Sequence, residues 1–235
     1  MYIVKITVDN YSEFYKFKNI VSKFSINIKK RRIKFKYNNL IELFNKLLEY
    51  NIKYKKINVY GWRKVEPIQW RFLSQNGDNV QFVSEKVLDE HVWNQTDHEN
   101  GIYYNNYKYS DIRTWLNNDF LEQAFYYDPS LIQTVNVDNS AKSTGDSINP
   151  YACEDTQDTV YLLSYKDICN EDYGFMDDAS RIAYDADGNA QDYWLRSPSY
   201  DGYEYARYVY YDGGVSSSGV YDSDGVRPAL TRKLD

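Results

Sequence analysis

Histidine and cysteine, the side chains most often used in nucleophilic and metal chemistry, number two each in this 235-residue sequence. Cys153 and Cys169 have a spacing that fits no zinc or redox motif, so we expect two reduced thiols. His91 and His98 have no serine or cysteine in a motif that would pair with them, which favours surface loop histidines. A metal site is the alternative there, because four acidic residues surround them: Asp89, Glu90, Asp97 and Glu99. The sequence therefore predicts no catalytic residue and no cofactor.

A second candidate for metal binding is Asp185–Asn189, which looks like the opening of a calcium loop. Its glycine, Gly188, stands at the fourth position instead of the sixth, and the twelfth position has no bidentate glutamate. We therefore expect a turn at Asp185–Asn189 and no bound metal.

The most unusual feature of the sequence is its tyrosine content, with 26 Tyr among 235 residues. Residues 199–224 alone hold seven Tyr, five Ser, four Asp and four Gly. A run of exposed tyrosines invites association unless it has a ligand to bind. In antibody paratopes the same mixture is used because Tyr gives rigid contact area and small residues give adaptable hydrogen bonds. The segment is predicted to be a ligand-binding surface, and an aromatic strand packed against the N-terminal part is the alternative.

Within residues 199–224 the apolar side chains recur singly, at Val209, Val215 and Val220. Tyr208 and Tyr210 flank Val209, and successive side chains of a strand point to opposite faces. We therefore expect the valines to face a core and the tyrosines to face solvent. The turn between the strands is expected at residues 212–214, Asp-Gly-Gly.

Two further strand regions are predicted to support this segment. Tyr193–Pro198 is an apolar strand that its proline ends. Residues 65–73 and 79–84 are expected to pair as a hairpin, because Asn76-Gly77 favours the turns that join antiparallel strands.

Two helices are predicted from capping residues. Ser110 is expected to cap a helix whose apolar face continues to Phe125. Ser164 and Asp167 have the spacing of a capping box. Between the two helices, the polar stretch 134–159 is predicted to be an exposed loop.

Residues 1–60 differ from the rest of the chain in charge. They hold 14 Lys and Arg against 4 Asp and Glu, a balance of +10, whereas residues 61–235 have a balance of −16. Apolar periodicity predicts four strands, near 2–8, 26–28, 33–37 and 57–59. One helix is expected after the first strand and another after the third. This β-α-β-β-α-β order is that of a small ferredoxin-like module. Two domains are therefore predicted, residues 1–60 and residues 61–235.

The basic run Lys29–Arg32 is expected at a hairpin turn of the first module. It has three interpretations. It could contact phosphate or another acidic partner, it could be a solvated turn that keeps a sheet edge soluble, or the basic module could dock on the acidic remainder of the chain.

Four blocks stand in order along the C-terminal part: Val65–Leu73 (VEPIQWRFL), Tyr109–Asn117 (YSDIRTWLN), Tyr193–Pro198 (YWLRSP) and Gly225–Leu230 (GVRPAL). They resemble the recurrent blocks of a bacterial and phage family with the C-type lectin fold, many members of which are variable proteins of diversity-generating retroelements. The resemblance covers residues 62–232. It implies an α+β protein with a C-type lectin fold in residues 61–235, after the ferredoxin-like module, and a variable region at about 193–230.

The resemblance also implies which residues bind ligand. In such systems the adenines of Asn codons are randomised at the first two positions, which yields Tyr, Ser, Asp and Gly but never Lys, Glu, Gln, Met or Trp. Residues 199–224 contain none of these five types except Glu204, which then has a different codon or is not diversified. The implied variable positions are Tyr200, Asp201, Tyr203, Tyr205, Tyr208, Tyr210, Tyr211, Asp212, Gly214, Ser216, Ser217, Ser218, Tyr221, Asp222 and Asp224. The implied scaffold is Ala206, Arg207, Val209, Val215, Val220 and Gly225–Leu230.

Other functions of the C-type lectin fold are less well matched. Formylglycine-generating enzymes share the fold, but Cys153 and Cys169 lie outside the C-terminal blocks where reactive cysteines would be expected. The Glu-Pro-Asn and Trp-Asn-Asp triplets of sugar-binding lectins are also missing, since Glu66-Pro67 is followed by Ile68. The resemblance therefore predicts a binding protein and not an enzyme.

The expected function is recognition of varied protein or cell-surface ligands through a surface that a retroelement diversifies. The alternatives are a carbohydrate-binding lectin of fixed specificity, or a structural or oligomerisation subunit of a phage or defence assembly. The sequence starts without the basic and apolar regions of a signal peptide and has no window of about 18 apolar residues. We therefore expect no membrane span, and a location in the cytoplasm or a phage virion.

Overall fold

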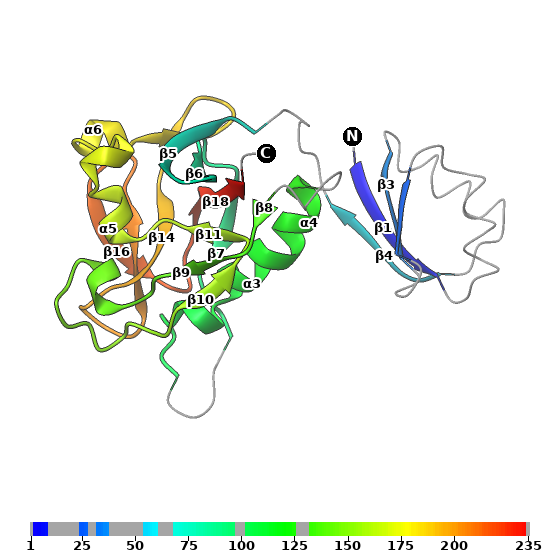
Figure 1. The fold of residues 1–235 in the computed structure, drawn as a ribbon. Coiled ribbons are helices and arrows are strands. Elements are labelled where there is room, and N and C mark those ends of the chain that lie inside the picture. Colours follow the sequence, from blue (N-terminus) through cyan, green and yellow to red (C-terminus); the bar gives the residue numbers. More distant parts are fainter. Residues whose placement is uncertain are drawn as a thin grey trace. The chain divides into compact units, whose positions relative to one another are not determined.

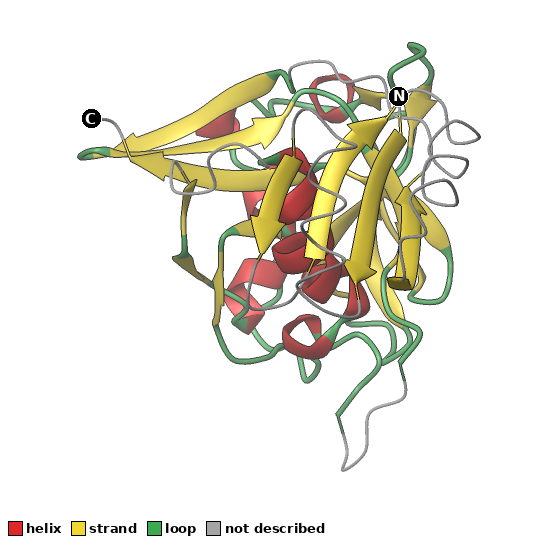
Figure 2. Ribbon diagram, turned by 90° about the vertical axis from the view of Figure 1, so that its right-hand side faces the viewer, coloured by secondary structure: helices red, strands yellow, loops and turns green. Residues whose placement is uncertain are grey.

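The protein is a mixed α+β structure in which strands predominate over short helices (Figures 1 and 2). The computed structural model describes the backbone of 2–8, 24–27, 32–37 and 54–60, and all atoms of 68–96, 102–125 and 132–233. The chain divides into two compact units, Met1–Pro67 and Ile68–Asp235. This division lies a few residues beyond the boundary after residue 60 that charge and composition predict.

The N-terminal unit contains a four-stranded antiparallel sheet in the order β2-β3-β1-β4. Its strands are β1 (Tyr2–Val8), β2 (Phe24–Asn27), β3 (Arg32–Tyr37) and β4 (Tyr54–Tyr60). Both β1 and β2 pair antiparallel with β3, so these two consecutive strands are parallel to each other and separated by β3. A β-α-β crossover produces such a parallel pair. The four predicted strands are present, whereas the two predicted helices and residues 29–31 of the basic run lie outside the described residues.

The first sheet of the C-terminal unit has the order β11-β18-β6-β5, and β8 also pairs with β18. Its strands are β5 (Trp70–Asn76), β6 (Asn79–Ser84), β8 (Ile132–Gln133), β11 (Val160–Leu162) and β18 (Pro228–Lys233). The predicted hairpin is confirmed: Asn76 pairs with Asn79, and Gly77 has the positive φ of +58° that a tight turn requires. Because β18 pairs with β6, this sheet joins the two ends of the unit.

The second sheet has the order β16-β15-β14-β17-β7. Its strands are β7 (Asp89–Val92), β14 (Tyr193–Pro198), β15 (Tyr205–Val209), β16 (Val215–Gly219) and β17 (Ser223–Val226). The predicted strand at 193–198 is confirmed as β14, and all six of its residues are buried. Tyr193 and Leu195 belong to one hydrophobic cluster and Trp194 to another, because successive side chains point to opposite faces. The central strand therefore separates two cores.

Short helices cover these sheets, as Figure 1 shows for α3 to α6. Ser110 caps α3 (Asp111–Trp115) by accepting a hydrogen bond from the backbone N–H of Arg113, as predicted. A π-helical turn (Leu116–Phe120) joins α3 to α4 (Leu121–Ala124). The predicted capping box of Ser164 and Asp167 begins α5 (Tyr165–Ile168). The other helical segments are α6 (Asp178–Arg181) and the 3-10 turns Tyr107–Tyr109, Ala141–Thr144 and Glu171–Tyr173.

No helix in the described part of the chain is long and apolar enough to cross a membrane.

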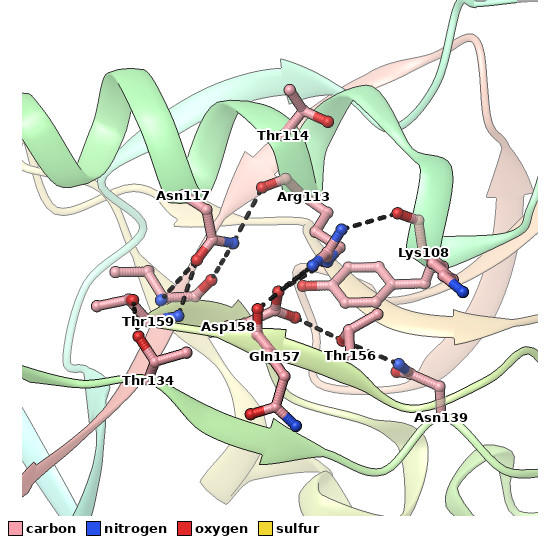
Figure 3. Close-up of polar contacts among 12 residues, drawn as sticks. Lys108, Arg113, Thr114, Asn117, Thr134, Asn139, Thr156, Gln157, Asp158 and Thr159 are labelled. Atoms are coloured by element: carbon pink, nitrogen blue, oxygen red, sulfur yellow. Dashed lines mark hydrogen bonds and ion pairs between the residues drawn. The ribbon is translucent and has the colours of Figure 1, made fainter.

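The prediction of an exposed loop at residues 134–159 is only partly right. This stretch contains a strand pair, β9 (Val135–Val137) with β10 (Thr156–Asp158), and several of its polar side chains are buried. Asp158 is fully buried and accepts hydrogen bonds from Arg113 Nε at 2.7 Å and from Thr156 Oγ1 at 2.6 Å (Figure 3). Asn139 Nδ2 donates to Thr156 Oγ1 at 3.1 Å. The polar residues are buried because they satisfy one another's hydrogen bonds, which a count of polar residues does not reveal.

Candidate functional site

Residues 199–224 form the β15–β16 hairpin and the loops on either side of it. Strand β15 pairs with β14 on one side and with β16 on the other, with Tyr208 opposite Ser216 and Val209 opposite Val215. Val209 is fully buried in the first core and Val220 is fully buried in the second, whereas Val215 is half-buried against the first. The valines anchor the segment to the unit, as the sequence predicts.

None of the fifteen implied variable positions is buried. Ten are exposed: Tyr200, Asp201, Tyr203, Tyr205, Tyr210, Tyr211, Asp212, Ser216, Tyr221 and Asp222. Five are half-buried: Tyr208, Gly214, Ser217, Ser218 and Asp224. The intervening scaffold differs, since Ala206, Val209, Val220 and every residue from 225 to 230 are buried. The segment therefore alternates between side chains that hold the fold and side chains that are available to a ligand.

The tyrosine side chains do not all point away from the core. Tyr208 is half-buried, and its ring lies edge-on to Trp194 with ring centroids 6.1 Å apart. It shares a strand face with Ala206, and this face covers the second core while Val209 faces the first. The expected exposure is thus found for six tyrosines and only in part for Tyr208.

Ring contacts join the tyrosines into two groups. In the first, the ring of Tyr210 lies 6.0 Å from that of Tyr208 and 4.3 Å from that of Tyr211. In the second, Tyr203 and Tyr221 both contact Tyr104, with centroids 6.0 and 5.6 Å apart. We call residues 199–224, with the tyrosines that contact them, the tyrosine surface.

Two tyrosines of this surface come from outside residues 199–224, and the sequence analysis missed them. They are Tyr104 and Tyr103, which lies 6.4 Å from Tyr203; Tyr151 in turn lies edge-on to Tyr103 at 5.0 Å. A signal was present for Tyr103 and Tyr104, because residues 103–109 read YYNNYKY. That run has the aromatic and small polar residues that mark the segment 199–224.

Asn105 fixes the loop that presents the second group. Its side chain is buried, and Nδ2 donates to the carbonyl oxygens of Gly202 and Tyr205, both at 2.9 Å. Its backbone N–H donates to the carbonyl oxygen of Tyr203 at 3.0 Å. Because these three bonds reach backbone atoms of the loop only, they do not depend on which side chains the loop carries.

The turn expected at residues 212–214 is confirmed between β15 and β16. The N–H of Gly213 donates to the carbonyl oxygen of Tyr210, and the N–H of Tyr210 donates to that of Gly214, both at 2.8 Å. Gly213 has a φ of +91°, and a Cβ there would lie 1.7 Å from the carbonyl oxygen of Asp178. Gly213 therefore belongs to the scaffold even though it lies within the tyrosine surface.

A cavity of about 240 Å³ opens beside the first tyrosine group. Tyr211 and the carboxylates of Glu90, Asp192 and Asp224 line it. The backbone N–H of Tyr211 donates to Asp192 Oδ1 at 2.6 Å. Burial, followed by the neighbouring charges of Asp192, Asp222 and Glu90, raises the pKa of Asp224 to about 6. Burial also raises the pKa of Asp192.

Of the side chains first considered for chemistry, the structure describes His91, Cys153 and Cys169. His91 lies in strand β7, not in the predicted surface loop, and its ring packs against Trp115 at 4.8 Å. Both cysteines are free thiols: Cys169 is exposed, and Cys153 is half-buried, with a pKa that burial raises. His98, Asp97 and Glu99 lie outside the described residues.

The expected turn at Asp185–Asn189 is present. The Asp185 carboxylate accepts hydrogen bonds from the backbone N–H groups of Asp187 and Asn189, both at 2.9 Å. These bonds, those of Asn189 first, lower the pKa of Asp185 to about 2. In the ranges whose side chains are described, no three His, Cys, Asp or Glu residues are grouped so that they could hold a metal ion.

Fold and surface together define a strand-rich α+β domain that displays clustered tyrosines. Residues 77–234 match the family described as a domain of unknown function, DUF6273, and the chain belongs to this family because the match spans more than half of it. No curated protein and no solved structure gives a significant match.

Proposed function

We propose that the C-terminal unit is a ligand-binding domain of the C-type lectin type, whose tyrosine surface a retroelement diversifies to recognise varied protein or cell-surface ligands. One observation carries this proposal: none of the fifteen implied variable positions is buried and only Tyr208 packs against a core, while the interleaved residues Ala206, Val209 and Val220 are fully buried. A surface can accept many side chains only if the fold does not depend on them. Apart from Tyr208, this arrangement meets that condition.

The blocks that carry the family resemblance support the same division. Tyr193–Pro198 is a central strand with every residue buried, and Gly225–Leu230 is likewise buried throughout. Ser110 and Ile112 of the block Tyr109–Asn117 are fully buried at the start of α3. These blocks hold the fold, and the segment between two of them holds the exposed positions. We would expect this of a domain with a constant scaffold and a variable surface.

The contacts between tyrosines support a protein ligand in particular. Tyrosine buries a large area while its hydroxyl remains able to form hydrogen bonds, which suits it to protein interfaces. The serines and aspartates between the rings already form bonds within the surface, for example Ser218 Oγ to Asp222 Oδ2 at 2.9 Å. Such polar groups can exchange these bonds for bonds to a ligand at low cost.

A display library tests the proposal. The full chain would be displayed on phage with the fifteen positions randomised and selected on purified lysozyme as a test ligand, beside a control library that randomises Ala206, Val209 and Val220. We expect the first library to keep folded members and to yield specific lysozyme binders, and the control library to lose the fold. A first library that unfolds as the control does, or that folds without yielding binders, would contradict the proposal.

Two further observations separate the proposal from its alternatives. Sequencing the flanking DNA should find a near-copy of the segment that encodes residues 193–230, differing at adenines, beside a reverse transcriptase gene. Saturable binding of the unaltered chain on a glycan array, abolished by Tyr203→Ala, would instead establish a carbohydrate lectin of fixed specificity.

A further inference from the structure

The charged side chains that line the cavity beside Tyr211 are all acidic. Its lining includes three carboxylates, from Glu90 in β7, Asp224 in β17 and Asp192 directly before β14, and the exposed ring of Tyr211. None of the side chains that line it is basic. Carboxylates gathered around a partly enclosed space repel one another unless a cation lies among them.

A second observation at this cavity concerns Asp224. Its Oδ2 atom is buried and has no hydrogen-bond partner among the described residues. A buried carboxylate oxygen without a partner is unfavourable, and native proteins pair nearly all such atoms. The pKa of Asp224 is raised first by burial and then by the neighbouring carboxylates, which agrees with repulsion among these groups. A positively charged group in the cavity would relieve that repulsion.

The cavity is continuous with the tyrosine surface. Tyr211 lines the cavity and also contacts the ring of Tyr210. Residues 199–224 carry five acidic residues against one basic residue, Arg207, whose guanidinium lies over the ring of Tyr165. A ligand that covers this surface meets aromatic faces and negative charge together. Both attract a guanidinium or an ammonium group.

We propose that the cavity is a specificity pocket of the tyrosine surface that receives an arginine or lysine side chain of a protein ligand. The inference rests on the proposed function, since Tyr211 belongs to the ligand-binding surface. The planar guanidinium of arginine suits the site better than the ammonium of lysine, because it can donate to two carboxylates while its face lies against a tyrosine ring. Ligands of this surface should therefore present a basic side chain at their centre of contact.

An NMR titration of the full chain with N-acetyl-arginine amide tests the pocket by itself. N-acetyl-citrulline amide is the matched control, since it has nearly the same shape without the charge. Above the pKa of Asp224, we expect the arginine compound to give saturable shifts at the backbone amides of Asp192, Tyr211 and Gly225, and the citrulline compound to give none. Asp224→Asn should weaken arginine binding about tenfold or more, because it removes one charge-assisted partner.

A second set of variants keeps this result interpretable. Asp119→Asn removes an exposed carboxylate from the helical segment 116–120 and should leave arginine binding unchanged. Tyr211→Leu removes the aromatic ring and should bind arginine several-fold more weakly. Equal chemical-shift changes with the arginine and citrulline compounds, or unchanged arginine binding by Asp224→Asn, would contradict the pocket proposal.

The pocket and the proposed function can fail separately. If the display library yields binders while arginine does not bind, the pocket proposal is wrong and the proposed function stands. If arginine saturates the cavity while the library yields no binders, the pocket stands as a cation site and the proposed function is wrong.

Discussion

Residues 134–159 and residues 199–224 look alike in sequence, but they bury different kinds of side chain in the structure. Both are polar and turn-rich. In the first, Asn139, Thr156 and Asp158 are buried and bonded to one another and to Arg113 of α3. In the second, most polar and tyrosine side chains face solvent, and the buried residues are Val209, Val220, Ala206, Gly213 and one polar residue, Ser199. Polar composition therefore does not decide exposure; the presence of partners on other elements does.

The largest expected effect comes from the same substitution made in both regions. Asp158→Ala leaves Arg113 without the carboxylate it contacts, and removal of one partner of a buried ion pair is strongly destabilising. Because Arg113 is itself partly exposed, we expect a loss of about 3 kcal/mol in the free energy of unfolding. Asp212→Ala should cost less than about 1 kcal/mol, since Asp212 is exposed.

Urea denaturation followed by tryptophan fluorescence measures both variants, because Trp93 and Trp194 are fully buried in the C-terminal unit. Equal losses for the two variants would remove the distinction between the regions.

The second prediction concerns two adjacent glycines of the tyrosine surface. Gly213→Ala should destabilise the unit by about 2 kcal/mol or more, because its backbone has a positive φ and a Cβ would overlap the carbonyl oxygen of Asp178. Gly214→Ala should change stability by less than about 1 kcal/mol, since a Cβ there approaches only the side chain of Asp212, at 3.2 Å. Thermal melts of the two variants decide this. A tolerated Gly213→Ala would show that the turn is not part of the scaffold.

The third prediction is a pH dependence of stability. The pKa of Asp224 is about 6 in the folded state against an ordinary value of 3.8, so the folded state binds the proton more tightly. Stability should therefore fall as the pH rises through the interval between these two values, and the loss persists at neutral pH. Asp224→Asn should stabilise the unit at neutral pH by about 1 kcal/mol or less, because solvent screens this partly exposed carboxylate.

The difference between the unaltered chain and Asp224→Asn should vanish below the ordinary pKa, where the carboxyl is protonated in both states. Denaturation curves across the pH range would contradict the account if Asp224→Asn were less stable at neutral pH.

Local patterns predicted much of the fold. The Asn76-Gly77 hairpin, the Ser110 cap and the Ser164–Asp167 capping box depend on residues close together in the chain, and all three are present. The core valines Val209 and Val220 were also found from their spacing.

Features that depend on distant partners were missed. Asp158 is buried because Arg113, 45 residues away, contacts it. Tyr103 and Tyr104 join the tyrosine surface only because the fold brings them to Tyr203, and Tyr208 is half-buried because its strand face covers the second core. Alternation within one strand cannot reveal that both faces of that strand meet a core.

The central claim is that the tyrosines of residues 199–224 are displayed on a scaffold that does not need them. Denaturation of Tyr200→Ala, Tyr205→Ala and Val209→Ala tests it most directly, since the two tyrosines are 54% and 44% exposed and Val209 is fully buried. We predict that each tyrosine variant loses no more than about 0.5 kcal/mol and that Val209→Ala loses about 1 to 3 kcal/mol through lost burial and a small cavity. Tyrosine variants that unfold beside an unaffected Val209→Ala would contradict the account.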